Sequence, residues 1–157
     1  MQRNMLRWLA SAALAFAPVA FAQDAGTTAW LEKEGLDAAS TKSLNEFDAV
    51  VARPKGGGDE RAIIFAKGKP AWQSNPKETE PGAKWTINSI GRDFDGNGQP
   101  DVHFSANTGG PNCCVTHHIY ELKPKVKRLA VYSAGSMGAS DFIDVPGRKA
   151  PIMISAD

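Results

Sequence analysis

Cysteine is nearly absent from this chain of 157 residues, which carries only the adjacent pair Cys113 and Cys114. Two neighbouring cysteines do not provide the disulfide framework that staples many small exported domains. The chain also lacks an excess of charge of either sign, because 18 basic residues face 17 acidic ones. Nucleic-acid-binding domains carry a basic surface, so this balance argues against a nucleic-acid partner.

Long apolar runs are missing except at the N-terminus. Residues 1–22 combine Arg3 and Arg7 with an uncharged apolar run and a small-residue ending, which is the three-part pattern of a cleaved secretory signal. The run is shorter than the about 20 residues of a membrane span. We therefore expect a periplasmic or secreted protein with a single domain over residues 23–157, a net charge of about −1 once the two arginines are removed, and no membrane span.

No convincing catalytic motif is present. The stretch AGSMG at 134–138 resembles a nucleophile elbow, but Ala134 replaces its first glycine and no helical pattern follows. The glycines at 56–58 lack the Lys-Ser/Thr pair and the helix of a phosphate-binding loop. A hydrolase that uses Ser136 is therefore the third hypothesis, and we expect a protein that is not an enzyme.

What the chain has in quantity is short stretches rich in β-branched and aromatic residues, separated by glycine, proline and asparagine. This sequence pattern predicts a mostly β fold, namely a small antiparallel sheet domain. Before residue 46 the periodicity is weak, and we expect only an ordered arm or a short helical turn near Trp30. Strands are expected at 47–54, 61–68 (a hairpin with the first), 69–74, 84–91, 101–106, 113–122, 128–134 and 151–156.

Carboxylates crowd into the stretch DFDGNGQPD at 93–101. Two like charges about 5 Å apart repel by roughly 3 kcal/mol at an effective dielectric near 20, and a hard divalent cation reverses the sign of that energy. Calcium suits a flexible loop with many oxygen donors better than magnesium, and zinc prefers sulfur and nitrogen. The alternative is a solvated turn without an ion, because Asn-Gly is itself a turn signal. The expected calcium ligands are the side chains of Asp93, Asp95, Asn97 and Asp101 and the carbonyl of Gln99.

The loop is not an EF-hand, which needs a glutamate at its twelfth position, where this chain has Phe104. The pattern D-x-D-G-N-G-x-x-D, followed by a strand, instead resembles the calcium loops of FG-GAP/VCBS-type repeats in integrin-like β-propeller blades. The run SANTGGPNCCVTHHIYEL at 105–122 is similar to bacterial exported proteins with such repeats. The resemblance covers residues 88–157. It implies blade-like units, calcium on the aspartate loop, and a protein or carbohydrate partner.

A faint internal echo supports a repeat. Asp93, Gly96 and Pro100 recur 51 residues later as Asp144, Gly147 and Pro151. The second copy has lost its other ligand and turn residues, so we expect no ion there. We expect blade-like repeats at about 88–139 and 140–157, the second degenerate and truncated at Asp157. Because a full propeller needs at least about four blades, the whole is a partial, propeller-like domain.

The histidines and cysteines offer an alternative function, that of a periplasmic copper- or zinc-handling protein using His103, His117, His118, Cys113 and Cys114. Four residues of strand span about 13 Å, so one strand cannot hold one ion by itself. Such a site would have to combine His103 with one histidine of the stretch 113–122. For the cysteines, a vicinal disulfide and two buried thiols both remain open.

Overall fold

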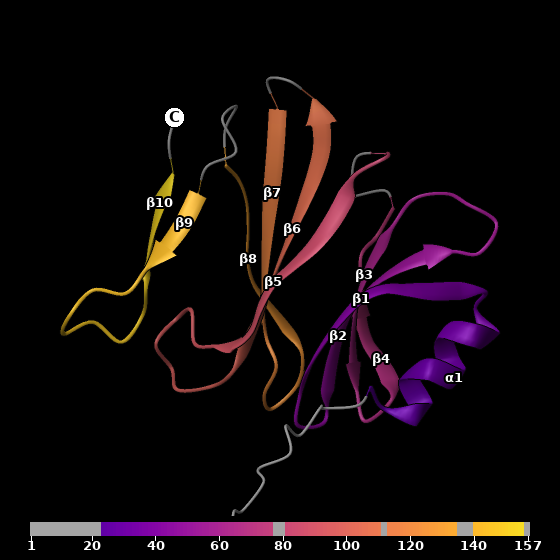
Figure 1. The fold of residues 1–157 in the computed structure, drawn as a ribbon. Helices are drawn as coiled ribbons and strands as arrows, with labels where there is room; N and C mark the ends of the chain where they lie inside the picture. Colours follow the sequence, from indigo (N-terminus) through magenta and orange to yellow (C-terminus); the bar gives the residue numbers. More distant parts are fainter. Residues whose placement is uncertain (1–22, 77–80, 111–112, 135–139, 156–157) are drawn as a thin grey trace, which may run out of the picture.

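A computed structural model describes residues 23–76, 81–110, 113–134 and 140–155 (Figure 1). Within these ranges the chain forms one helix and ten strands. The elements are α1 (Ala25–Lys33), β1 (Leu36–Leu44), β2 (Phe47–Pro54), β3 (Arg61–Ala66), β4 (Lys69–Gln73), β5 (Lys84–Arg92), β6 (Asp101–Gly110), β7 (Cys113–Glu121), β8 (Lys127–Ser133), β9 (Ser140–Ile143) and β10 (Ile152–Ser155).

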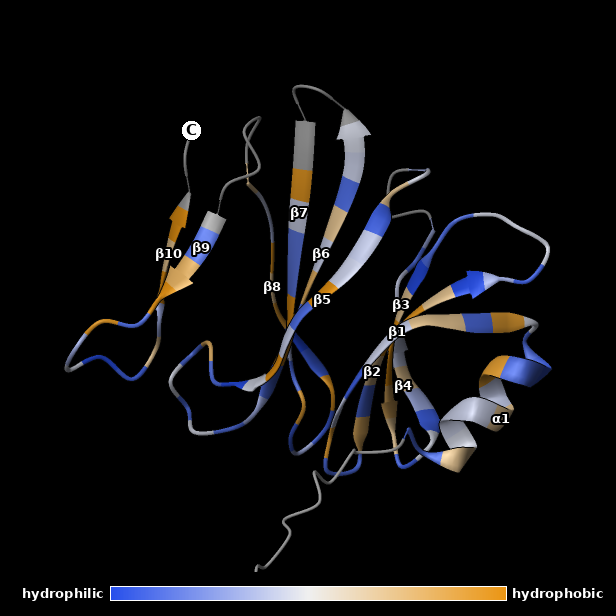
Figure 2. Cartoon of the chain, viewed as in Figure 1, coloured by the Kyte–Doolittle hydropathy of each residue, from blue (hydrophilic) through white to orange (hydrophobic). Residues whose placement is uncertain are grey.

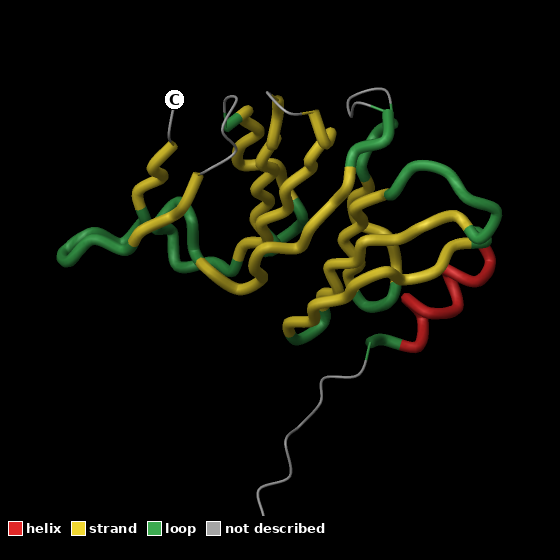
Figure 3. The backbone as a smooth tube through the Cα atoms, turned by 45° about the horizontal axis from the view of Figure 1, so that its top comes forward, coloured by secondary structure: helices red, strands yellow, loops and turns green. Residues whose placement is uncertain are grey.

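The strands form two four-stranded antiparallel sheets and a two-stranded hairpin, each joined in sequence order (Figure 3). The first sheet has the order β1-β2-β3-β4, the second β5-β6-β7-β8, and β9 pairs with β10. The mostly β prediction is therefore confirmed. So are the hairpin of 47–54 with 61–68, which is β2 with β3, and the third strand at 69–74, which is β4.

The prediction for the segment before residue 46 was incomplete. A nine-residue helix contains Trp30, and its buried residues are Thr27 and Leu31. The strand β1, however, was not expected. Nearly all of its side chains are exposed or half-buried, because β1 lies at the edge of its sheet. A strand without a buried face has no alternating pattern that could announce it.

The core lies in two apolar layers on either side of the first sheet, and hydrophobic residues recur along both sheets (Figure 2). One layer packs α1 on the sheet through Leu31, Val50 and Phe65. The other packs the first sheet on the second and includes Ile64 and Phe104. The central strands β2 and β3 are therefore buried on both faces, which explains their continuous apolar runs.

Glu60 joins the two sheets through a buried carboxylate. It accepts hydrogen bonds from the Trp85 backbone N–H at 2.8 Å and from Arg53 Nε at 2.7 Å, and its side chain is 2% exposed. Burial opposes ionisation, but these donors outweigh it and lower the pKa of Glu60 below 4.5. The charged form thus stabilises the fold above pH 4.5, and this contribution is lost as the pH falls through the lowered pKa.

We expect Glu60→Gln to lower the free energy of unfolding at pH 7 by about 1.5–3 kcal/mol, the range for hydrogen bonds to charged groups. The deficit should shrink towards pH 3, where the wild-type carboxyl is also neutral. Urea unfolding at both pH values measures it, with the exposed Glu46→Gln as the control. A deficit of equal size at both pH values would contradict the assignment.

Candidate metal centre

The aspartate-rich loop connects β5 to β6 and curls around the Asp93 carboxylate. One oxygen of Asp93 accepts from Gly96 N and the other from Gly98 N, each at 2.7 Å. Gly96 and Gly98 have φ angles of 80° and 84°, in the region that favours glycine. These two glycines let the loop turn its alternate side chains to one side, as the sequence predicts.

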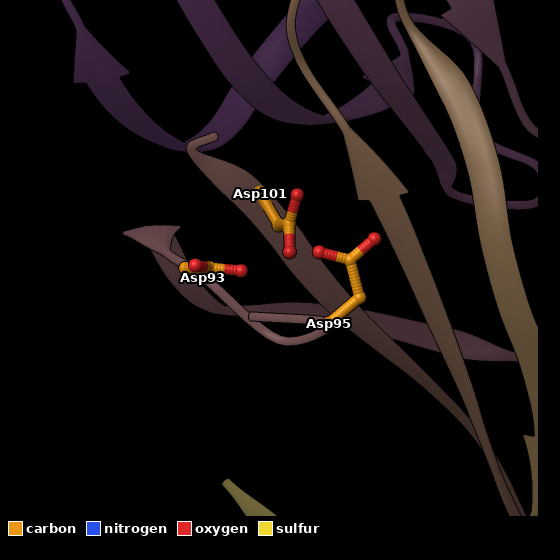
Figure 4. A group of neighbouring side chains, drawn as sticks. All are labelled: Asp93, Asp95 and Asp101. Atoms are coloured by element: carbon orange, nitrogen blue, oxygen red, sulfur yellow. The ribbon is translucent and has the colours of Figure 1, made fainter. Parts of the chain in front are cut away.

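Three of the predicted ligand residues come together. One carboxylate oxygen from each of Asp93, Asp95 and Asp101 lies within 4.8 Å of the other two (Figure 4). Asp95 is exposed, Asp93 is half-buried and Asp101 is buried. The group thus sits at the mouth of the loop, open to solvent on the Asp95 side, and all of its donors are oxygens.

Of the three carboxylates, that of Asp101 is the most buried and has an oxygen that accepts no hydrogen bond among the described residues. Its side chain is fully buried at 0% exposure. Oδ2 accepts from the Phe94 N–H at 2.7 Å, but Oδ1 is buried with no hydrogen-bond partner among the described residues. Burial, followed by the charges of Asp95, Asp93 and Glu121, raises the pKa of Asp101 to about 6. A cation beside Oδ1 would balance this charge, so the residues present fit a hard divalent ion.

Asn97 and Gln99 lie in the same loop with different contacts. The Asn97 amide group donates to Asp95 Oδ2 at 3.0 Å and to Glu121 Oε2. The Asn97 carbonyl oxygen accepts the Gln99 backbone N–H at 2.6 Å. In this arrangement Asn97 links the loop to β7, and Gln99 donates its backbone N–H to the Asn97 side chain.

Glu121 is a residue that the sequence analysis missed. It lies on β7 directly opposite Asp101, is 6% exposed, and its Oε1 is 3.3 Å from Lys127 Nζ. A fourth carboxylate therefore backs the loop. The one signal in the sequence is an acidic residue between Tyr120 and Leu122 in an apolar strand, and only the pairing of β6 with β7 brings it to the loop.

The second copy of the loop pattern, which lies between β9 and β10 and contains Asp144 and Gly147, packs against the aspartate-rich loop. A Cβ atom on Gly96 would be 3.1 Å from Lys149 Cβ and 3.2 Å from Ala150 N. Gly147, the counterpart of Gly96, has a similar φ of 83°. Asp144, the counterpart of Asp93, accepts from Arg92 Nη2 at 2.7 Å, so its charge is balanced by an arginine.

The histidines are separated by the alternation of β7. His117 faces His103 of β6, with its Nδ1 2.8 Å from His103 Nε2. His118 points to the opposite face, where its ring lies 4.8 Å from that of Trp85. Burial, with neighbouring His117 and Arg92, lowers the pKa of His103 to about 4, and burial lowers that of His117. The side chains of Cys113, Cys114 and Ser136, with the disulfide and hydrolase hypotheses, lie outside the described residues.

The described part of the chain contains no helix with the length and apolar character to cross a membrane. In comparisons with known proteins, no protein-family model, no curated protein and no solved structure matches the chain.

Proposed function

We propose that the protein is an exported β domain, stabilised by calcium, that serves as a binding or structural module rather than as an enzyme. The observation that carries the proposal is Asp101, whose fully buried carboxylate has one oxygen without a partner among the described residues and faces two further carboxylates. Ionising such a group without a cation is costly, because each unpaired buried charge loses its hydration.

Calcium would be held by Asp93, Asp95 and Asp101, with the loop's amide and carbonyl oxygens and water completing the six to eight ligands that this ion takes. Magnesium demands a stricter octahedron, and the group contains no nitrogen or sulfur that would favour zinc. The ion's role is to offset most of the negative charge of the loop. Because the loop joins β5 to β6 and Asp101 lies opposite Glu121 of β7, a loop held by the ion fixes the end of the second sheet.

The arrangement of strands supports a reading of the sheets as blade-like units. Each sheet is a four-stranded antiparallel meander, and four-stranded sheets packed face to face are the building unit of β-propellers. The second sheet, Lys84 to Ser133, falls within the expected repeat at about 88–139 apart from its first residues, and β9 with β10 falls within 140–157. The first sheet would then be a further unit that the internal echo does not include.

The proposed partner is a protein or a carbohydrate, as the resemblance to integrin-like repeats implies. Export rests on the signal pattern of residues 1–22. Expression in a bacterial host, followed by the intact mass of the periplasmic product, tests it: we expect a chain that begins near Gln23, and a full-length product retained in the cytoplasm would contradict export.

Calcium binding can be measured directly by isothermal titration. We expect about one equivalent bound by the wild type and, for Asp95→Asn, an affinity lower by roughly tenfold to a hundredfold, since a lost carboxylate contact is worth about 3 kcal/mol or less. Asp95 suits the test because it is exposed, so the variant keeps the fold.

The matched control is Asp144→Asn, which removes an arginine-paired carboxylate at the position equivalent to Asp93 and leaves all of the proposed ligands unchanged. Its calcium affinity should equal that of the wild type. Absence of calcium binding by the wild type at millimolar concentration, or an equal loss in both variants, would remove the basis of the proposal.

A further inference from the structure

The outer face of the second sheet carries a second polar centre that the calcium proposal does not use. On this face β9 contributes Phe142, whose ring lies 5.2 Å from that of His103 and 4.7 Å from that of Phe94. The His117 ring stacks on Tyr132 of β8, with centroids 5.0 Å apart and planes 9° apart. Phe94 and Phe142 therefore pack on the His103 ring, and Tyr132 packs on the His117 ring.

An open cleft of about 230 Å³ reaches both imidazoles. A β-bulge in β5 places two consecutive residues, Asn88 and Ser89, beside His103. The Asn88 amide nitrogen lies 3.2 Å from His103 Nε2, and the Ser89 hydroxyl is buried with no hydrogen-bond partner among the described residues. The cleft is lined, besides the two histidines, by Asn88, Ser89, Arg92, Phe94, Asp141 and Phe142.

The positions of the two nitrogens suit one metal ion. His103 Nε2 and His117 Nδ1 are 2.8 Å apart. Two metal–imidazole bonds of about 2.0–2.1 Å at a right angle separate their nitrogens by about 2.8–3.0 Å, whereas a tetrahedral angle needs about 3.3 Å. Right-angled coordination by nitrogen and oxygen is typical of Cu(II), which also heads the affinity order of the divalent first-row metals.

We propose that His103 and His117 form a second metal site, separate from the aspartate loop, that takes Cu(II). Both imidazoles are buried, which favours the neutral form that binds a metal. Within the described residues, the aspartate trio is the one group of three or more acidic, histidine or cysteine ligands. The remaining equatorial positions on the copper are therefore filled by water and by an oxygen of the cleft such as the buried Ser89 hydroxyl.

The experiment titrates the protein with Cu(II) in saturating calcium, so that the aspartate loop does not compete for copper. Cys113 and Cys114 are both replaced by serine in every sample, which removes thiol ligands. We expect one equivalent of copper whose electron paramagnetic resonance spectrum carries the hyperfine signature of imidazole nitrogen. His103→Gln and His117→Gln should each weaken copper binding at least tenfold and change that signature.

His118→Gln is the matched control, because it alters the same strand on the opposite face and leaves the cleft intact. Its copper affinity and spectrum should equal those of the parent. The parent spectrum needs no further variant, so it tests the proposal even if a buried-histidine variant fails to fold. A parent protein without imidazole-bound copper, or a control that loses copper as His117→Gln does, would show that the two rings share only a hydrogen bond. The imidazole signature distinguishes copper at the histidines from copper at the aspartate loop, whether or not the loop binds calcium.

Discussion

Removal of calcium is expected to lower the free energy of unfolding by about 2.7–4 kcal/mol, relative to protein in calcium at 100 to 1,000 times its Kd. The physical reason is that the ion binds only the folded loop, where three carboxylates converge. For a domain of this size the melting temperature should fall on the order of 10 °C. Differential scanning calorimetry in calcium and in chelator measures the shift.

The variant Asp101→Asn tests the proposal through the direction in which its stability differs from that of the wild type. In chelator at pH 7 it should be as stable as the wild type or more stable, because the wild type must ionise a buried carboxyl whose pKa is raised from 3.8 to about 6. Because the pKa of Asp101 is raised, the contribution of this group to the free energy of unfolding is greatest below pH 3.8. It is lost, by about 3 kcal/mol, as the pH rises through about 6. In calcium the variant should lose this advantage, because it lacks a ligand.

The control for both measurements is Asp144→Asn, which should respond to calcium as the wild type does. Equal melting temperatures with and without calcium in the wild type would contradict the calcium proposal. A variant Asp101→Asn that is less stable than the wild type in chelator would show that the protein stabilises the buried charge of Asp101 without a metal.

Replacement of Phe104 by alanine is expected to cost about 3–5 kcal/mol, the range for a large buried aromatic residue. Phe104 is 0% exposed on β6, and its ring lies 6.0 Å from that of Trp72 on β4 and 6.2 Å from that of Trp85 on β5. It therefore packs in the layer that both sheets share. A cavity there should weaken both sheets together.

Urea unfolding followed by tryptophan fluorescence and by far-ultraviolet circular dichroism tests this coupling. We expect the two signals to coincide in the wild type and in Phe104→Ala, at a lower urea midpoint for the variant. Val131→Ala, at a side chain that is 44% exposed, should change stability by no more than about 0.5 kcal/mol. Two separate transitions would mean that the sheets are independent units.

Much of the strand content could be predicted from local sequence patterns, because buried strand positions are occupied by apolar residues. The runs at 47–54 and 61–66 are apolar because β2 and β3 are covered on both faces. In β6, Val102 and Phe104 alternate with Asp101 and His103, since one face meets the core and the other carries the polar groups. The sequence pattern did not predict the edge strand β1, because β1 has no alternation of buried and exposed residues.

The amino-acid sequence alone determined which residues could serve as ligands, because the spacing of aspartate and glycine at 93–101 is a local property that a single loop can express. It also determined that His117 and His118 point to opposite faces, which follows from the period of a strand. Only the tertiary structure decided that Glu121 backs the loop, that His103 meets His117, and that two sheets share one core. Those facts depend on the register and stacking of strands that are distant in the chain, and no local pattern encodes them.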